Sequence, residues 1–195
     1  MGVVSDFIYG LFGDYGDAGL LICVFLIFLI DAMIFPALPE LFFIVGYDYN
    51  PTPLYGVLLI AMAIAAELVG VFSLYFIVKR IRVPKKIKSA VDKYVGFLVV
   101  SDEKMLLVNR IAPMIPFAGA FIAMIDTWDP KKCAIYIVIG CIIKYGAILL
   151  ATSYFYSYFS GPMAFKVTLV FIIAVIILSL IASYIRKKKS GWDAS

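Results

Sequence analysis

The sequence contains no histidine and only three cysteines. Without histidine, imidazole chemistry is absent and the usual zinc sites are not expected. Cys23, Cys133 and Cys141 lie in apolar runs without a CxxC or other ligand spacing, so we expect buried small side chains. There is no P-loop, G-x-S-x-G or H-E-x-x-H motif. We therefore expect no enzyme activity, no cofactor and no metal site.

Charged residues are also scarce, at 15% of the 195 residues, while hydrophobic residues make up 64%. This composition is typical of an integral membrane protein and excludes an ordinary soluble domain. The net charge of +4 is concentrated in two basic segments, 79–93 and 186–189. Lysine and arginine beside apolar spans determine membrane orientation, so this distribution indicates topology and gives no reason to expect nucleic acid as a partner.

An arginine and two prolines, Arg110, Pro113 and Pro116, interrupt the apolar run 105–125. In hydrocarbon a charged side chain costs roughly 2.5–3.5 kcal/mol on insertion scales. Proline removes a backbone donor that water cannot replace there. Such a segment is tolerated only where protein or a wet cavity surrounds it, and it therefore marks a candidate site.

The same Pro-x-x-Pro spacing occurs 77 positions earlier, at residues 36–39. The same offset aligns Pro53 with Pro130. It also aligns Glu67 with Lys144, each near the centre of a long apolar segment. These matches predict two related halves, although chance remains an alternative because the rest of the alignment is only generically apolar. Paired proline-interrupted segments in corresponding halves point to a transporter's binding site.

The apolar run 18–46 is too long for one straight helix, which would reach about 43 Å against a hydrocarbon core of about 30 Å. It either tilts strongly or folds back at its prolines. A span is expected over 54–78, with a packing face of small residues at Ala63, Ala66 and Gly70. Further spans are expected over 133–159 and 163–185.

Between the halves, the basic connector 79–104 is expected to carry an amphipathic helix after Pro84. Apolar residues recur at helical spacing opposite its lysines: Ile87, Val91, Tyr94, Val95 and Leu98. Such a helix fits an anionic membrane surface.

The basic segments predict the topology, because they are expected on the cytoplasmic side. With the tail at 186–189 inside, the two last spans place the loop 126–132 inside as well. The run 105–125 must then enter and leave by the same face, as a re-entrant hairpin. By the repeat, 18–46 is a hairpin from the outside, and the acidic N-terminus lies outside too.

The predicted fold is therefore an all-α integral membrane protein with two opposed re-entrant helical hairpins in inverted repeats, plus about three transmembrane helices. We expect one multi-pass domain in the cell membrane. Its parts are repeat 1 (about 18–78), the connector (79–104), repeat 2 (about 105–159) and a final transmembrane helix (163–185).

Five ionisable residues lie at the predicted membrane depth: Asp31, Glu40, Glu67, Arg110 and Lys144. Unpaired, they would cost on the order of 12–17 kcal/mol together, so they must face one another or water. Opposed hairpins would bring Glu40 and Arg110 into one polar cavity. As counterparts in the repeat, Glu67 and Lys144 are expected to approach each other. An ion-pair lock that fixes helix register is the alternative for the four, and Asp31 could equally cap a hairpin or snorkel.

Two stretches resemble one known family. RIAPMIPF, residues 110–117, is similar to the R-x-x-P-x-x-P-F signature of the DedA/VTT superfamily, which includes SNARE-associated-type and small multidrug-export-type membrane proteins. FPALPELFFIVG, residues 35–46, resembles that superfamily's first-hairpin pattern of prolines, a glutamate and a closing glycine. The resemblance runs over about 18–159. By matching position, Glu40 corresponds to the hairpin glutamate and Arg110 to the motif arginine.

The resemblance implies opposed re-entrant hairpins and movement of polyprenyl-phosphate carriers or phospholipids between leaflets, with proton coupling proposed for bacterial members. The bacterial DedA branch usually has a second arginine where this chain has Pro116, as VTT-like branches do. Lipid translocation in general is therefore the expectation, rather than an undecaprenyl-phosphate function.

We thus expect a lipid transporter or scramblase for an anionic head group, with protons as a coupling partner. The planar fork of an arginine suits a phosphate. The candidate substrate-binding residues are Arg110, Pro113, Pro116 and Lys144, and the candidate proton-coupling residues are Glu40, Glu67 and Asp31. In the alternative, a proton-coupled exporter of small cations or drugs, the three acids bind the cation. A membrane scaffold is the third class, and whether the chain forms a homo-oligomer stays open.

Overall fold

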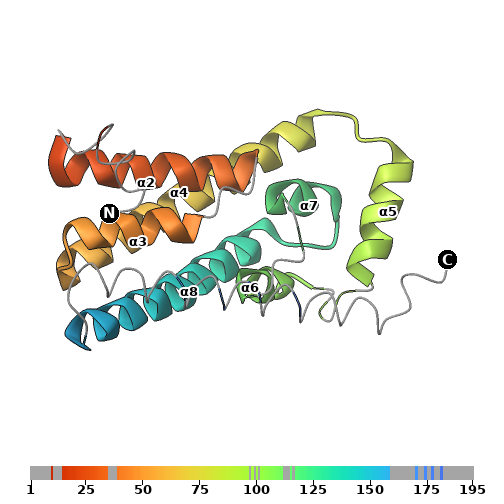
Figure 1. The fold of residues 1–195 in the computed structure, drawn as a ribbon. Coiled ribbons are helices and arrows are strands. Elements are labelled where there is room, and N and C mark those ends of the chain that lie inside the picture. The colour runs from red at the N-terminus through yellow and green to blue at the C-terminus, as the bar shows by residue number, and fades with distance from the viewer. Residues whose placement is uncertain are drawn as a thin grey trace.

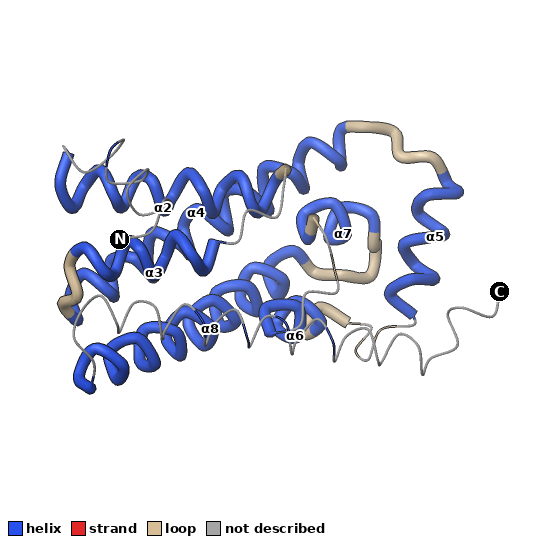
Figure 2. The backbone as a smooth tube through the Cα atoms, viewed as in Figure 1, coloured by secondary structure: helices blue, strands red, loops and turns tan. Residues whose placement is uncertain are grey.

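A computed structural model of the chain contains only helical elements within the part that it describes (Figure 1; Figure 2). The described residues are 10, 15–34, 39–96, 98, 100, 102–111, 115, 117–158, 170, 174, 177 and 181. Pro36, Pro113 and Pro116 lie outside them, as do most of the expected last span and the basic tail.

The elements are α2 (Gly16–Met33), α3 (Pro39–Tyr49), α4 (Pro53–Arg80), α5 (Lys85–Gly96), α6 (Met105–Ile111), α7 (Ala118–Met124) and α8 (Pro130–Tyr158). By length and composition, α2, α4 and α8 could each cross a membrane. The expectation of an all-helical chain with apolar spans is therefore confirmed at this level. One difference is that α2, expected as one arm of a hairpin, has 18 residues and is itself long enough to be a span.

The run 18–46 folds back rather than forming one tilted helix. Helix α2 ends at Met33, α3 begins at Pro39, and α3 runs back alongside α2 (Figure 1). The next helix, α4, starts with a proline at its first position after Thr52, whose hydroxyl accepts a hydrogen bond from the Tyr55 amide at 3.4 Å. Both features favour a helix start, because proline lacks only a donor that is unused there and the hydroxyl satisfies another.

Helix α4 is the centre of the bundle and packs against α2, α7 and α8. Ala63, Ala66 and Gly70 are all buried, so the predicted face of small residues is confirmed. A Cβ atom at Gly70 would lie only 2.6 Å from the Cβ of Ala32 on α2. The absence of side-chain atoms therefore allows α2 and α4 to approach closely.

The chain returns to one end of the bundle between α4 and α8. Helix α4 ends there, α5 lies across it, and α8 starts from it and runs back beside α4 (Figure 1). Lys88 of α5 forms an ion pair of 3.7 Å with Asp126, in the loop before α8. The loop 126–132 and the basic connector therefore lie at the same end, as the sequence predicts, and the segment with α6 and α7 begins and ends there.

Helix bounds recur at the offset found in the sequence. Helices α4 and α8 both begin with the aligned prolines, Pro53 and Pro130, and are 28 and 29 residues long. When the residue numbers of α3 are increased by 77, the resulting range encloses α7. The last residue of α2, shifted in the same way, falls one residue before the last residue of α6.

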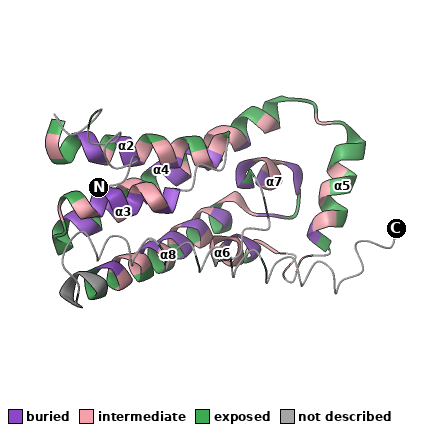
Figure 3. Ribbon diagram, viewed as in Figure 1, coloured by how far each residue is buried: buried purple, intermediate pink, exposed green. Residues whose placement is uncertain are grey.

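An aromatic cluster fills the core where α2, α3 and α8 meet. The ring of Tyr145 lies 5.0 Å from that of Phe28 and 5.1 Å from that of Phe43, measured between centroids. All three side chains are fully buried, and buried residues line the inner faces of the bundle (Figure 3). This cluster adjoins Lys144 and so forms one wall of the site described next.

Candidate functional site

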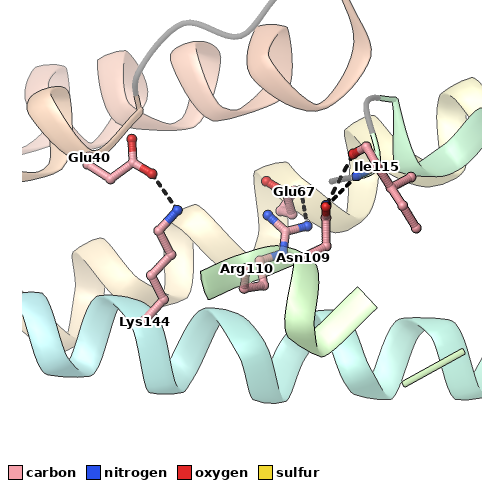
Figure 4. A network of polar contacts seen from close by, with 6 residues as sticks. All are labelled: Glu40, Glu67, Asn109, Arg110, Ile115 and Lys144. Atoms are coloured by element: carbon pink, nitrogen blue, oxygen red, sulfur yellow. Dashed lines mark hydrogen bonds and ion pairs between the residues drawn. The ribbon is translucent and has the colours of Figure 1, made fainter. Parts of the chain in front are cut away.

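Two ion pairs join the first part of the chain to the second (Figure 4). Arg110 of α6 donates a hydrogen bond from Nη2 to Oε1 of Glu67 on α4. Lys144 of α8 donates from Nζ to Oε1 of Glu40 on α3. The side chains of Glu67 and Arg110 are only 4% and 11% exposed, whereas those of Glu40 and Lys144 are 10% and 24% exposed. The first pair is therefore the more deeply buried one.

Four of the five ionisable residues predicted at membrane depth thus face one another, but in a different pairing from the predicted one. Glu67 does not bond Lys144; each takes a partner from a different helix. The fifth, Asp31, lies near the end of α2 and is partly exposed. Pro113 and Pro116 fall outside the described residues, so their predicted part in binding stays a prediction.

The position of Gly140 explains this pairing. A Cβ atom there would lie 2.6 Å from Cγ of Arg110, so the arginine side chain crosses α8 where α8 has no side chain of its own. Lys144 follows one helical turn later on the same side of α8. It therefore meets α3 and Glu40, while Arg110 occupies the place opposite Glu67. Gly140 was not among the residues predicted from the sequence, although a mid-helix glycine four positions before a lysine was a usable signal.

The Glu67–Arg110 pair leaves two atoms without partners. Within the described residues, Oε2 of Glu67 and Nε of Arg110 are buried and have no hydrogen-bond partner. An unsatisfied buried group costs about 1–3 kcal/mol, and more when it is charged. The pair therefore offers one more acceptor and one more donor than it uses.

Asn109 holds the backbone just beyond Arg110. Its Nδ2 donates to the carbonyl of Ile115 at 3.2 Å, and its Oδ1 accepts from the amide of Ile115 at 2.6 Å (Figure 4). One carboxamide thus satisfies both backbone groups of a residue that lies between α6 and α7, outside any helix. Such groups need a partner wherever water is excluded. Asn109 was not among the site residues predicted from the sequence, although an amide side chain beside an arginine in an apolar run could have suggested a role.

One turn of α8 brings the two ion pairs together. Cys141 lies between Gly140, where Arg110 crosses, and Lys144, and it is fully buried. Nζ of Lys144 lies 5.5 Å from the centroid of the Tyr145 ring, a distance at which a cation and an aromatic face attract each other. All three cysteines are buried thiols, as predicted. Among the described residues, no three acidic or thiol side chains are grouped so that they could hold a metal ion.

The site therefore consists of two cations and two carboxylates between the candidate spans α2, α4 and α8. Two of their buried side-chain atoms have no hydrogen-bond partner within the described residues. Comparisons of the chain with family models, with curated proteins and with solved structures found no match. The resemblance to the DedA/VTT superfamily thus rests on residues 35–46 and 110–117 alone, and the geometry of the ion pairs carries the functional argument.

Proposed function

We propose that this protein moves an anionic lipid, a polyprenyl-phosphate carrier or a phospholipid, between the leaflets of a cell membrane. The observation that carries the proposal is the buried pair of Arg110 and Glu67, in which a guanidinium nitrogen and a carboxylate oxygen have no partner within the described residues. A site that binds and releases an anion needs a buried cation whose existing partner can be exchanged.

The fold that goes with this proposal is a pair of opposed re-entrant hairpins in inverted repeats, α2–α3 and α6–α7, each followed by a long span, α4 or α8. Its support is the recurrence of helix starts at Pro53 and Pro130 and the return of the chain to one end of the bundle between α4 and α8. The ion pairs support it too. Glu40 of the first proposed hairpin forms an ion pair with α8, and Arg110 of the second forms one with α4.

Arg110 is the proposed anchor for the phosphate. Its planar group can donate two parallel hydrogen bonds to a phosphate, and Nε is one of the donors suited to such a fork. In the structure Nη2 is bonded to Glu67 and Nε has no described partner. A phosphate oxygen at Nε would satisfy that donor. A second oxygen would then compete with Glu67 for the rest of the guanidinium.

Lys144 is the proposed first contact for the head group. Its side chain is more than twice as exposed as that of Arg110, and it also borders the Tyr145 ring. Lysine acts as a point charge with three rotatable donors, so it can hold Glu40 and reach an incoming phosphate without a fixed geometry. Arg110 crosses α8 at Gly140 and Lys144 lies one turn later on the same side, which makes transfer from Lys144 to Arg110 a short step along α8.

The carboxylates give the proposed coupling to protons. When a phosphate takes Arg110, Glu67 loses its cation while it stays buried. An unpaired buried charge is strongly unfavourable, and uptake of a proton removes that charge. Glu40 would behave in the same way after loss of Lys144. Release of the lipid would restore both ion pairs and return the protons.

A cation exporter is the second candidate, and the unpartnered Oε2 of Glu67 favours it, since that oxygen could accept from an ammonium group. In such a protein the acids must be available to the substrate. Here each acid is the less exposed member of its ion pair, at 4% for Glu67 and 10% for Glu40, whereas Arg110 and Lys144 are 11% and 24% exposed. The anionic substrate is therefore the better fit.

Leaflet exchange in proteoliposomes tests the proposal. Labelled polyprenyl phosphate, labelled phosphatidylethanolamine and a cationic dye are offered separately to the full chain, with protein-free liposomes as background. We expect protein-dependent exchange of an anionic or phosphate-bearing lipid and no dye transport. Dye transport without lipid exchange would establish the exporter instead. If the protein shows neither activity, the ion pairs have a purely structural role.

A further inference from the structure

Helix α5 lies across one end of the bundle and does not run along it. Figure 1 shows it transverse to α4 and α8, and it follows directly on the end of α4 through the connection 81–84. If α4 and α8 cross a bilayer, a helix transverse to them at their ends lies along the bilayer surface. The sequence predicts an amphipathic helix at this position, and the structure adds what each half of that helix contacts.

The C-terminal half of α5 packs against the rest of the protein. Val95 is 5% exposed, and the Tyr94 ring packs edge-on against Phe121 of α7 with centroids 5.9 Å apart. From the N-terminal half, Lys88 also reaches Asp126, two residues after the end of α7, at 3.7 Å. These contacts fix α5 to the helix that follows the Arg110 segment.

The N-terminal half of α5 and the connection before it project from the bundle (Figure 3). Ile81 is 60% exposed and Ile87 is 50% exposed, although Ile87 lies on the apolar face of the helix. Exposed cations are next to these two isoleucines in the sequence, Arg80 and Arg82 on either side of Ile81 and Lys85 and Lys86 just before Ile87. Exposed apolar side chains beside such cations are typical of a helix that rests in the head-group region.

We propose that residues 79–93, the basic arm, form a docking surface for the anionic face of the lipid bilayer itself. The segment carries seven lysines and arginines and one acid, Asp92. Charges near an anionic surface attract it individually, while exposed isoleucines enter the boundary between head groups and acyl chains. A nucleic acid would use the cations but leave Ile81 and Ile87 in water. The bilayer satisfies both kinds of side chain.

Docking has a consequence for the site, because the basic arm is fixed to α7. Seating Ile81 and Ile87 in the membrane holds α5 in place, and Tyr94 and Lys88 then hold the end of α7 through Phe121 and Asp126. Helix α7 also approaches α4 so closely that a Cβ atom at Gly119 would lie 2.1 Å from the carbonyl oxygen of Val71. The lipid surface thereby steadies α7, the helix that follows the segment with Arg110.

A fluorescent probe at Ile87→Cys in the full chain tests the proposal directly. The protein is reconstituted in phosphatidylcholine vesicles with or without phosphatidylglycerol. Quenching by a lipid-attached spin label is compared with quenching by iodide in the water. The parent chain gives the labelling background, since its three cysteines are buried. We expect quenching by the lipid label to dominate with phosphatidylglycerol and to weaken without it or at high salt.

Two pairs of variants separate the basic arm from general charge. Lys85→Gln/Lys86→Gln removes two exposed cations from the arm and should lower the ratio of docked to undocked probe by roughly 30-fold, at about 5-fold per lysine. Lys131→Gln/Lys132→Gln removes two exposed cations at the same end, from the start of α8, and should leave the ratio nearly unchanged.

Iodide quenching that is equal in both lipids would overturn the proposal, as would equal losses in the two double variants. Protection that rises with the ratio of protein to lipid, and not with phosphatidylglycerol, would identify a second copy of the chain as the occupant and would also contradict it. The probe reports position and not transport. The result therefore stands or falls independently of the proposed function.

Discussion

Arg110 and Glu67 depend on each other because their side chains are only 11% and 4% exposed and each is the other's charged partner. Removing one side of such a pair leaves a buried charge, which is more destabilising than removing both. The energetic signature of this contact is therefore non-additivity, and it distinguishes the observed pairing from the predicted one between Glu67 and Lys144.

We expect Glu67→Gln and Arg110→Met each to destabilise the protein by about 3–5 kcal/mol, and the double variant to recover much of that loss. Thermal unfolding in detergent measures all three. Glu67→Gln combined with Lys144→Met should instead give nearly additive losses, since those residues are not bonded to each other. Additive losses for Glu67 with Arg110 would refute the observed pairing.

The second pair provides a graded comparison. Lys144 is more exposed than Arg110, so water can solvate the survivor when its partner is lost. Glu40→Gln and Lys144→Met should therefore each lower the unfolding temperature less than the corresponding changes at Glu67 and Arg110. Equal or larger losses at Glu40 and Lys144 would mean that burial does not rank the two pairs.

Asn109 should matter for the backbone as well as for its neighbour. Asn109→Ala removes both hydrogen bonds to Ile115 and should cost about 1–3 kcal/mol. Asn109→Asp keeps an acceptor for the Ile115 amide but loses the donor to its carbonyl. Amide hydrogen exchange at Ile115 should therefore be fast in Asn109→Ala and slower in Asn109→Asp. Equal protection of the Ile115 amide in the parent and both variants would show that the hydrogen bonds from Asn109 are not needed to hold this backbone.

Among the helices, α7 depends most on a missing side chain. A Cβ atom at Gly119 would fall 2.1 Å from Val71 O and 3.0 Å from the backbone nitrogen of Tyr75, both on α4. Backbone atoms cannot move aside as a flexible side chain can. Gly119→Ala should therefore force α7 away from α4.

The expected loss for Gly119→Ala is about 1–3 kcal/mol, as for other overpacked sites. Gly146→Ala on α8 is the matched control, because no atom of the residues that the structure describes lies within 4 Å of the added atom. Alanine is the better helix former, so that variant should be as stable as the parent or slightly more so. Similar unfolding temperatures for the two variants would mean that α7 and α4 are not in close contact.

The long helices could be predicted from the sequence because each leaves a direct mark on it. Apolar runs give the spans, and Pro53 and Pro130 mark the starts of α4 and α8. Ala63, Ala66 and Gly70 mark the packing face. The short helices α6 and α7 are a different matter, since their ends depend on contacts such as that of Asn109 with Ile115, which no local pattern records.

The residues that make up the site could be predicted from the sequence, but the way in which they pair could not. A charged residue in an apolar run has to be paired or solvated, which singled out Glu40, Glu67, Arg110 and Lys144. Which acid meets which base depends on the crossing of α6 over Gly140 and on the position of Lys144 one turn further along α8. That is a property of tertiary packing. Glu67 and Lys144 are separated by the offset of 77 residues along the chain, but they do not form an ion pair with each other.

For the whole molecule, the distribution of charge predicts orientation. The end that carries the basic arm and the loop 126–132 should face the cytoplasm, and the end with the loop at 50–52 should face outside. An impermeant maleimide added outside should therefore label Pro51→Cys and miss Lys86→Cys and Thr127→Cys. Labelling of Thr127→Cys from outside would place α6 and α7 across the membrane and contradict the second hairpin.

The central claim is that the buried arginine binds an anionic head group rather than only locking helices together. The double variant Glu67→Gln/Arg110→Met separates these roles, since it should regain stability while it lacks the proposed anchor. Lys132→Met is the control, because Lys132 is exposed and lies outside both ion pairs and outside the basic arm.

Exchange of labelled polyprenyl phosphate and anionic phospholipid between leaflets is measured for the parent and both variants, reconstituted in equal amounts of folded protein. We expect loss of protein-dependent exchange in Glu67→Gln/Arg110→Met and near-parental exchange in Lys132→Met. Parental rates in the folded double variant would contradict the central claim, and would reduce the Arg110–Glu67 pair to an ion-pair lock.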